Sequence, residues 1–177
     1  MSEVINMTTP LSIADVRKLN AGDIIKLSGT IYTGRDAAHK RLCALLDENK
    51  PLPVDLEGQL IYFVGPCPAP PGRVIGSAGP TTSGRMDAYS PILIEKCGLT
   101  GMIGKGGRSA AVVDAMKRFG AVYFGATGGA GALIAQKIKS CEVIAFPELG
   151  TEAIHKLYVE DFPLVVAIDA EGCSLYD

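Results

Sequence analysis

The 177-residue sequence has no excess of basic residues and no long apolar run. Lys and Arg total 17 against 19 Asp and Glu, for a net charge of −2, and no basic stripe favours nucleic-acid binding. No segment approaches the roughly 18 apolar residues that a membrane-spanning helix needs. The first residues also lack the charged start and apolar stretch of a signal peptide. These absences predict a cytoplasmic protein that binds neither nucleic acid nor membrane.

Paired cysteines are missing as well. The five cysteines lie tens of residues apart, at Cys43, Cys67, Cys97, Cys141 and Cys173. An odd number without paired spacing does not indicate a disulfide framework. Because no C-x-x-C pair is present, the chain carries no sequence signature of a zinc site or an iron–sulfur cluster. We expect most of these cysteines to be small buried side chains, and we expect no metal to be bound by this chain.

Apolar residues make up 47% of the sequence and charged residues 20%. This balance supports a sizeable core and argues against disorder. The length fits one domain. A Pro/Gly-rich stretch at residues 65–72 is short enough to be a rigid surface loop rather than a linker. We therefore predict a single domain over residues 1–177.

Strands and helices are expected to alternate along most of the chain. Alternating or short apolar runs predict strands at 25–31, 60–64, 99–103, 121–124, 143–146 and 164–168. Capping residues and helical spacing predict helices at 12–19, 36–47 and 109–119, and from about 131 to 139. Gly120 stands where a glycine commonly ends a helix. This alternation predicts a layered α/β domain.

Three glycine-flanked segments carry cations or hydroxyl groups where strands are expected to give way to helices. They span residues 33–39, 79–87 and 104–107, and they contain Arg35, Arg85 and Lys105. Ligands of open α/β sheets bind outside the carboxyl ends of the strands, where such loops gather. Arginine grips a carboxylate with two parallel hydrogen bonds, and glycines let backbone N–H groups approach an anion. The three cations therefore predict a clamp for a small multivalent acid.

Two of these segments also carry groups suited to proton transfer. Residues 81–83 are Thr-Thr-Ser, and such a hydroxyl becomes a useful base only when a neighbouring base, cation or metal activates it. His39 has an ordinary pKa in the range useful for acid–base work. A helix that begins at Asp36, with Asp36 as its cap, places His39 in the first turn near the Asp36 side chain.

Each feature also has a structural interpretation. A Gly-Arg or Gly-Lys-Gly turn often carries only a solvated charge, His39 and His155 are candidates for structural histidines, and residues 81–83 are a candidate capping run. The segment Thr127–Gly131 only loosely resembles a phosphate-binding loop, because it lacks the G-x-G-x-x-G pattern and a Walker lysine. A nucleotide-binding domain is thus a weaker alternative, and helix–strand packing is the simpler explanation of that glycine-rich segment.

Taken together and in order, the segments resemble a known family. Residues 79–87, GPTTSGRMD, are similar to the signature stretch of class I fumarase C-terminal domains and of the beta subunit of L(+)-tartrate dehydratase. Residues 34–39, GRDAAH, resemble an arginine–histidine segment near the start of that subunit, and residues 104–107, GKGG, resemble its lysine loop. The late segment 162–169, FPLVVAID, also fits. The resemblance runs from about residue 22 to residue 169.

This resemblance implies a more specific fold and a set of site residues. The family fold is a swivelling β/β/α domain, which is consistent with the α/β prediction. Thr81 falls on the family's catalytic threonine, and His39 falls on a histidine with an active-site role in the tartrate dehydratase relatives. Arg35, Arg85 and Lys105 fall on residues that bind the substrate carboxylates.

The resemblance also implies a partner and a cofactor. The family uses a [4Fe–4S] cluster held by three cysteines of another domain or of a larger alpha subunit, and the active site forms between the two parts. It implies a hetero-oligomer with two copies of each subunit that reversibly hydrates fumarate to L-malate. Tartrate or a methylated dicarboxylate is an alternative substrate. A non-catalytic anion-binding module of the same fold is an alternative of a different class.

Overall fold

The structure is a computed structural model that describes residues 3–126 and 134–176. Within that part of the chain the strands form one sheet in the order β1-β2-β3-β4-β5-β7-β6. The strands are β1 (Val4–Thr8), β2 (Ile24–Thr33), β3 (Leu60–Tyr62), β4 (Gly101–Gly104), β5 (Val122–Ala126), β6 (Ile138–Ala145) and β7 (Ile154–Ile168). Strands β1 to β5 pair in parallel, whereas β7 runs antiparallel to β2, β5 and β6. The sheet is therefore mixed.

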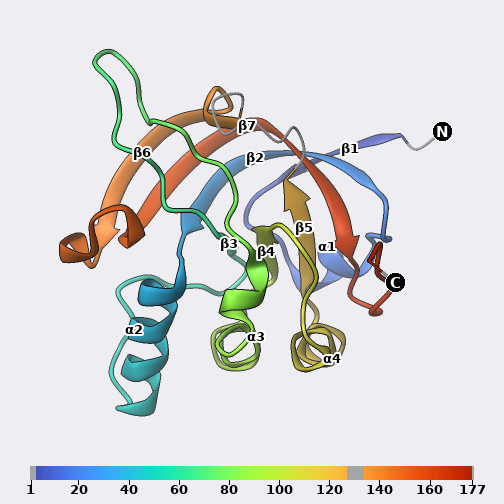
Figure 1. The fold of residues 1–177 in the computed structure, drawn as a ribbon. Helices are drawn as coiled ribbons and strands as arrows, with labels where there is room; N and C mark the ends of the chain where they lie inside the picture. The colour runs from blue at the N-terminus through green and yellow to red at the C-terminus, as the bar shows by residue number, and fades with distance from the viewer. Residues whose placement is uncertain (1–2, 127–133, 177) are drawn as a thin grey trace.

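The long strand β7 curls the sheet into a barrel-like arrangement (Figure 1). Along one edge β7 pairs with β2, from Ile24↔Val165 to Tyr32↔Lys156. Along its other edge it pairs first with β6 and then with β5. Strands β2, β3, β4, β5 and β7 therefore form a closed ring, because the last strand of the ring bonds back to the first.

The described residues form four helices, of which α2, α3 and α4 pack on one side of this sheet. They are α1 (Ile13–Arg17), α2 (Asp36–Asp47), α3 (Ser90–Cys97) and α4 (Ala110–Phe119), with 3₁₀ turns η1 (Ser83–Met86) and η2 (Pro147–Glu152). Helices α2, α3 and α4 lie next to one another below β3, β4 and β5 in Figure 1. Their inward side chains, among them Leu42, Leu93 and Met116, share a buried cluster with Phe63 and Met102.

A second buried cluster fills the interior of the curled sheet. Neighbouring residues of a strand point to opposite faces. Tyr62 and Phe124 accordingly belong to the interior cluster, whereas Phe63 and Tyr123 face the helices. The two clusters hold the strand ends in fixed register, with Thr33 opposite Tyr62, Tyr62 opposite Ile103 and Ile103 opposite Phe124.

Several sequence predictions are confirmed at the residue level. Ser12 caps α1 in a reciprocal capping box with Asp15, Ser109 caps α4 through the backbone N–H of Val112, and Gly120 ends α4 in a left-handed conformation. The predicted strands at 25–31 and 121–124 correspond to β2 and β5. No helix of the described residues is long and apolar enough to cross a membrane.

Other predictions are wrong or coarse. The residue at the N-cap of α2 is Arg35, and Asp36 stands in the first turn, because the Asp36 carboxylate pairs with Arg85 instead of capping the helix. The helix predicted to reach 139 is wrong at its end, because β6 begins at Ile138 and pairs with β7. Strand β1 and helix α3 were not anticipated. The segment Thr127–Gly131 and the helix start near 131 lie outside the described residues. The swivelling β/β/α form stays a prediction, while a mixed α/β domain with a barrel-like sheet is observed.

Candidate functional site

The predicted site residues follow three neighbouring parallel strands at the edge where those strands end. Strands β2, β3 and β4 run parallel and in register, so their carboxyl ends meet at one edge of the sheet. Arg35 comes two residues after β2, and Lys105 comes directly after β4. Thr81 and Arg85 lie at the end of the long loop that leaves β3. The fold therefore brings all three glycine-flanked segments to this edge.

Arg35 lies at the start of α2 against the loop after β3. A Cβ built on Gly65 would be 3.1 Å from Arg35 Cδ and 3.2 Å from its Nη1. The absence of a side chain at Gly65 thus lets the arginine lie against the loop backbone. The Arg35 Nε is buried and has no hydrogen-bond partner among the described residues. This donor is available to a ligand or to water.

Asp36 joins the start of α2 to η1. Its Oδ2 pairs with Arg85 Nη2 at 2.8 Å. The Arg85 side chain is 55% exposed and that of Asp36 is 32% exposed, so the pair contributes little to stability. The second oxygen of Asp36, Oδ1, is buried without a partner among the described residues.

His39 is buried one turn into α2. Its Nδ1 lies 2.8 Å from the carbonyl oxygen of Arg35; since a carbonyl only accepts, Nδ1 carries the hydrogen and Nε2 carries the lone pair. That Nε2 is buried and unpartnered within the described residues. Burial, the main cause, lowers the pKa of His39 from 6.5 to about 4, so the ring is neutral at pH 7. Its ring meets Phe63 edge-on, with the centroids 5.4 Å apart.

The hydroxyl run lies between β3 and the lysine loop. The Thr81 N–H donates to the carbonyl of Phe63 at 2.7 Å, and the Ser83 N–H donates to the carbonyl of Lys105 at 2.9 Å. Thr82 and Lys105 form a parallel bridge. Lys105 itself is exposed. These bonds place Thr82 and Ser83 beside Lys105, with Thr81 beside Phe63, which the sequence alone did not establish.

The approach of η1 to β4 is very close at Gly104. A Cβ at this position would be 1.9 Å from Ser83 Oγ and 2.9 Å from Phe63 Cδ2. Only a glycine leaves room for the buried Ser83 side chain, whose Oγ lies 2.7 Å from the hydroxyl of Tyr123. The glycine before Lys105 is therefore required by packing, in addition to any contact with an anion.

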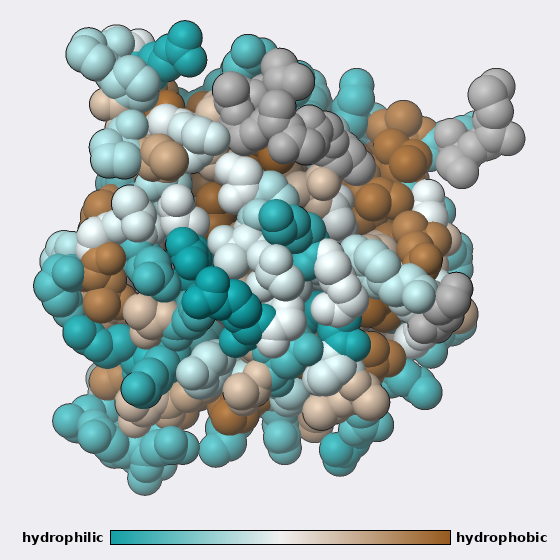
Figure 2. Space-filling model, viewed as in Figure 1, coloured by the Kyte–Doolittle hydropathy of each residue, from teal (hydrophilic) through white to brown (hydrophobic). Residues whose placement is uncertain are grey.

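Unpartnered buried polar atoms are concentrated at this edge. Among the described residues they are Arg35 Nε, Asp36 Oδ1, His39 Nε2 and, away from this segment, Thr9 Oγ1. Buried polar groups are nearly always hydrogen-bonded. One donor and two acceptors left open within five consecutive residues therefore indicate a place for a polar ligand or ordered water. Figure 2 shows hydrophilic side chains gathering on the visible face, over the space between the start of α2 and η1.

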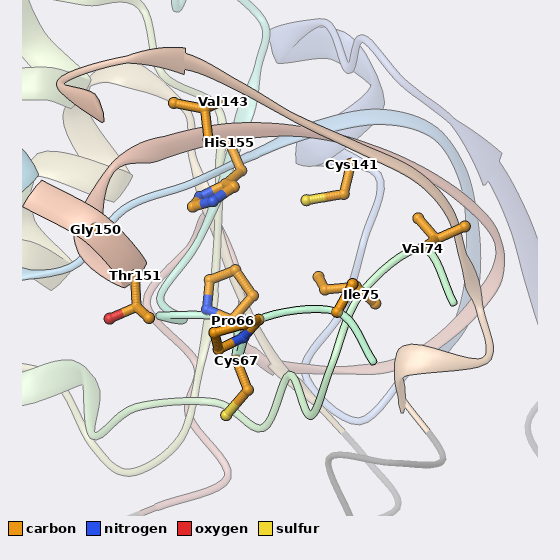
Figure 3. Close-up of a pocket in the computed structure, with 11 residues that line it drawn as sticks. Pro66, Cys67, Val74, Ile75, Cys141, Val143, Gly150, Thr151 and His155 are labelled. Atoms are coloured by element: carbon orange, nitrogen blue, oxygen red, sulfur yellow. The ribbon is translucent and has the colours of Figure 1, made fainter. Parts of the chain in front are cut away.

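A hollow lies elsewhere, between the loop after β3 and the β6–β7 pair (Figure 3). It has a volume of about 370 Å³ and contains none of the predicted site residues. It is lined by Pro66, Cys67, Pro68, Ala69, Val74, Ile75, Cys141, Val143, Gly150, Thr151 and His155. Because this lining holds no arginine or lysine, it does not suit a dicarboxylate, and we place the candidate site at the strand ends instead.

His155, which lines this hollow, has the hydrogen bonds of a structural residue. Its Nδ1 lies 2.9 Å from the carbonyl oxygen of Ala153, and its backbone N–H donates to Thr33 Oγ1 at 3.0 Å. Burial lowers the pKa of this histidine. These contacts tie β7 to the end of β2, in agreement with the structural interpretation of His155.

Sequence reasoning missed two residues that lie just behind the site. The Arg108 side chain is 0% exposed, and its Nε donates to Asp87 Oδ1 at 2.7 Å. The sequence signal for this pair was the aspartate of the segment 79–87 and an arginine four residues after Gly104. Neither stands out, because charged residues near turns are usually solvated.

The described residues do not fit a metal or an iron–sulfur cluster. Over 3–126 and 134–176, no three His, Cys, Asp or Glu side chains are grouped to hold a metal ion. A cluster needs several thiolate ligands at one place. The open groups near Arg35, one donor and two acceptors, suit instead a polar ligand or water that both donates and accepts hydrogen bonds.

The mixed α/β fold, with cations and open hydrogen-bonding groups at the carboxyl ends of its parallel strands, defines an α/β domain with a candidate ligand site at those ends. Sequence comparison makes this assignment specific: the chain belongs to the family described as "Fumarase C-terminus", whose family model matches residues 1–177. The resemblance seen in the three glycine-flanked segments is thereby confirmed.

Individual relatives carry related names. The chain is 45% identical, over 86% of its length, to the anaerobic class I fumarate hydratase of Escherichia coli K12, and 41% identical, over 88%, to fumarate hydratase 2 of Leishmania major. It spans only 28% of the length of each. It is also 40% identical to a Methanocaldococcus jannaschii protein named provisionally as L(+)-tartrate dehydratase subunit beta, over 94% of this chain and 88% of that protein.

Proposed function

We propose that this chain is the beta subunit of a two-subunit [4Fe–4S] hydro-lyase that reversibly hydrates fumarate to L-malate in the cytoplasm. Its partner is a larger alpha subunit, in a hetero-oligomer with two copies of each. The chain spans only 28% of the length of the fumarate hydratases that it resembles. This coverage supports a division of the activity between this domain and another. The chain also covers 88% of a protein named as a beta subunit, which supports a separate polypeptide.

One observation carries the proposal for the site. Arg35 Nε, Asp36 Oδ1 and His39 Nε2 are buried and open at the same helix start, and Arg85 is paired to Asp36 at 2.8 Å. The open donor of Arg35 and the exposed fork of Arg85, which pairs with the adjacent Asp36, are groups that suit a planar carboxylate. Lys105, bonded through its backbone to the same η1 turn, adds a third positive charge. A doubly charged acid matches this set.

The reaction requires these charges for a physical reason. Removal of a proton next to a carboxylate produces a carbanion-like intermediate, whose charge spreads onto that carboxylate. Arg35, Arg85 and Lys105 are proposed to hold the substrate carboxylates and to stabilise this charge. Thr81, whose backbone is fixed to the carbonyl of Phe63, is proposed to transfer the proton. Its hydroxyl is a poor base unless nearby cations activate it.

His39 is proposed to act in the same site, and its surroundings limit what it can do. A ring with a pKa near 4 is neutral at pH 7 and is a weak base. Its Nδ1 is occupied by the carbonyl of Arg35, so only Nε2, which is buried without a partner among the described residues, is open to a further hydrogen bond. We therefore propose that His39 accepts a hydrogen bond there, from substrate or from water, rather than carrying the proton between turnovers.

The cluster is proposed to belong to the alpha subunit. The described residues do not group metal ligands, so no step of the reaction is assigned to a metal on this chain. When bound by the partner, a cluster with an open iron supplies a Lewis acid for the hydroxyl group.

The test is kinetic and uses the complex reconstituted anaerobically with the alpha subunit. Arg85→Ala and Lys105→Ala are each expected to lower kcat/KM for fumarate by about 10²-fold or more, with an unchanged melting temperature, because both side chains are exposed. Arg118→Ala and Lys50→Ala, which change exposed charges on α4 and beside α2, are matched controls that should remain active. Normal rates in both site variants would refute the proposed clamp.

A second candidate is L(+)-tartrate dehydration, which the 88% coverage of the provisionally named tartrate dehydratase subunit favours. Tartrate adds a hydroxyl to the dicarboxylate. A site built to hydrogen-bond that hydroxyl discriminates strongly against an analogue that lacks it. Comparing kcat/KM for malate, tartrate and a methylated dicarboxylate with the same complex distinguishes these candidates.

A further inference from the structure

The Arg108 side chain is a buried junction between the elements that carry the proposed clamp. It follows the lysine loop, and its guanidinium lies 5.1 Å from the ring centre of Phe63 and 5.0 Å from that of Tyr123. Its Nη1 is 3.2 Å from the sulfur of Met102. With 0% of the side chain exposed, this cation does not face solvent and cannot itself hold a substrate at the surface.

Arg108 instead grips the turn that carries Arg85. Its Nε donates to Asp87 Oδ1 at 2.7 Å, and its Nη2 donates to Ser90 Oγ, also at 2.7 Å. The Ser90 hydroxyl donates in turn to the carbonyl of Met86 at 3.1 Å. The two residues that directly follow Arg85 are therefore both held, one by an ion pair and one through a hydroxyl.

The start of α4 adds a second contact on the same carboxylate. The backbone N–H of Ser109 donates to Asp87 Oδ2 at 2.8 Å. Asp87 thus receives one bond from the guanidinium and one from the N-cap residue of α4, at a helix start where a negative charge is favoured. Both bonds come from residues that follow the lysine loop.

Tyr123 ties the same two segments from the strand side. Its hydroxyl donates to the carbonyl of Gly106 at 2.7 Å, so the Ser83 hydroxyl, 2.7 Å away, must be the donor to the tyrosine oxygen. The lysine loop and η1 are therefore joined twice, by Arg108 with Asp87 and by Tyr123 with Ser83.

We propose that Arg108 is a positioning residue that sets the spacing between Arg85 and Lys105 through its ion pair with Asp87. The inference rests on the proposed function, since it concerns the geometry of that clamp. Arg85 and Lys105 are both exposed and have long flexible side chains. The distance between their charged groups is therefore set by where the two backbone segments lie. The segment from Phe63 to Thr82 contains no helix or strand, so contacts at its end determine where Arg85 lies.

A stability role alone would not require a charge at this position. Replacing a buried ion pair by well-packed apolar groups is often neutral or stabilising, whereas removing one partner leaves an uncompensated buried charge. The variants are chosen on this basis. Arg108→Met and Asp87→Asn each break the pair, and the double variant removes the isolated charge while an amide oxygen remains for the Ser109 N–H. Arg108→Lys keeps the charge but loses the planar fork. Arg118→Met, an exposed arginine of α4, is the control.

Two measurements separate positioning from stability. The first is hydrogen exchange of the Thr81 and Ser83 amides in the 177-residue chain. These amides donate to the carbonyls of Phe63 and Lys105, and their exchange can be measured without any enzymatic activity. The second is kcat and KM in the complex with the alpha subunit. We expect Arg108→Lys and the double variant to keep a near-native melting temperature, to exchange these two amides at least about tenfold faster, and to lose about 10- to 100-fold in kcat/KM.

Native exchange together with native kcat/KM in the stable double variant would overturn the proposal. If the double variant does not fold, native exchange together with native kcat/KM in Arg108→Lys would overturn the proposal instead. Accelerated exchange of the Thr81 and Ser83 amides would support the positioning role even if the wild-type complex shows no hydratase activity, in which case the proposed function alone fails. The Arg118→Met control should match wild type in both measurements.

Discussion

Gly104→Ala tests how closely the lysine loop packs against η1. The added methyl carbon would lie 1.9 Å from Ser83 Oγ, 2.9 Å from Phe63 Cδ2 and 3.3 Å from Ser83 Cβ. Forcing a methyl group into a packed site costs about 1–3 kcal/mol, and the contact with Ser83 places this substitution at the upper end. For a chain of this length each kcal/mol corresponds to about 2–4 °C in Tm. We therefore expect the Tm to fall by about 5–10 °C.

A double-mutant cycle identifies the clashing atom. Ser83→Ala removes the Oγ and costs about 1 kcal/mol for its hydrogen bond to Tyr123. Because the 1.9 Å contact then disappears, Ser83→Ala combined with Gly104→Ala should be less destabilised than the sum of the single variants by about 1 kcal/mol. The remaining contact with Phe63 prevents complete recovery. Urea unfolding of all four proteins provides the free energies.

Gly107→Ala is the matched control, since nothing lies within 4 Å of a Cβ at that position. It should change the free energy of unfolding by no more than about 0.5 kcal/mol. Additive effects of Ser83→Ala and Gly104→Ala, or an equal cost at Gly107, would show that the close approach of η1 to β4 is not the cause and would refute the argument.

Two further predictions concern His39 and the cluster. The folded-state pKa of His39 is lowered from 6.5 to about 4, so its stabilising contribution is complete above pH 6.5 and is lost as the pH falls toward 4. The loss amounts to about 3 kcal/mol. Urea unfolding across this range should show a shallower pH dependence of the unfolding free energy for His39→Gln than for wild type, and equal slopes would contradict the lowered pKa. The chain purified without its partner is expected to be colourless and inactive with fumarate, and a brown chromophore or hydratase activity would disprove the proposed division between subunits.

The sequence was most informative where a local pattern determines local structure. The Ser12 and Ser109 caps and the glycine that ends α4 follow from side-chain chemistry within one turn of helix. The alternation in β2 likewise reflects one buried face. The three glycine-flanked segments were recognised because their residue order is specific, and the parallel register of β2, β3 and β4 explains why they meet.

What the sequence did not reveal depends on contacts between distant residues. The sequence predicts Asp36 as a helix cap, but its carboxylate is paired with Arg85, which lies 49 positions further along the chain. Only the folded structure shows this pairing. Residues near 138 read as helix, yet pairing with β7 makes them a strand, because β structure depends strongly on its neighbours. Arg108 reads as a surface charge, and only the packed rings of Phe63 and Tyr123 show that it is buried.

Strand β7 also has a consequence for the order in which the molecule can form during synthesis. The proposed site residues all lie before residue 106, but the ring of strands that supports them closes only through pairings of β7 with β2 and β5. On the ribosome, a nascent chain that stops before Ile154 has complete site segments on an open sheet, with the edges of β2 and β5 unpaired by β7. Such edges invite pairing with other chains. The aggregation risk of this protein should therefore be greatest late in translation, just before its last strand emerges.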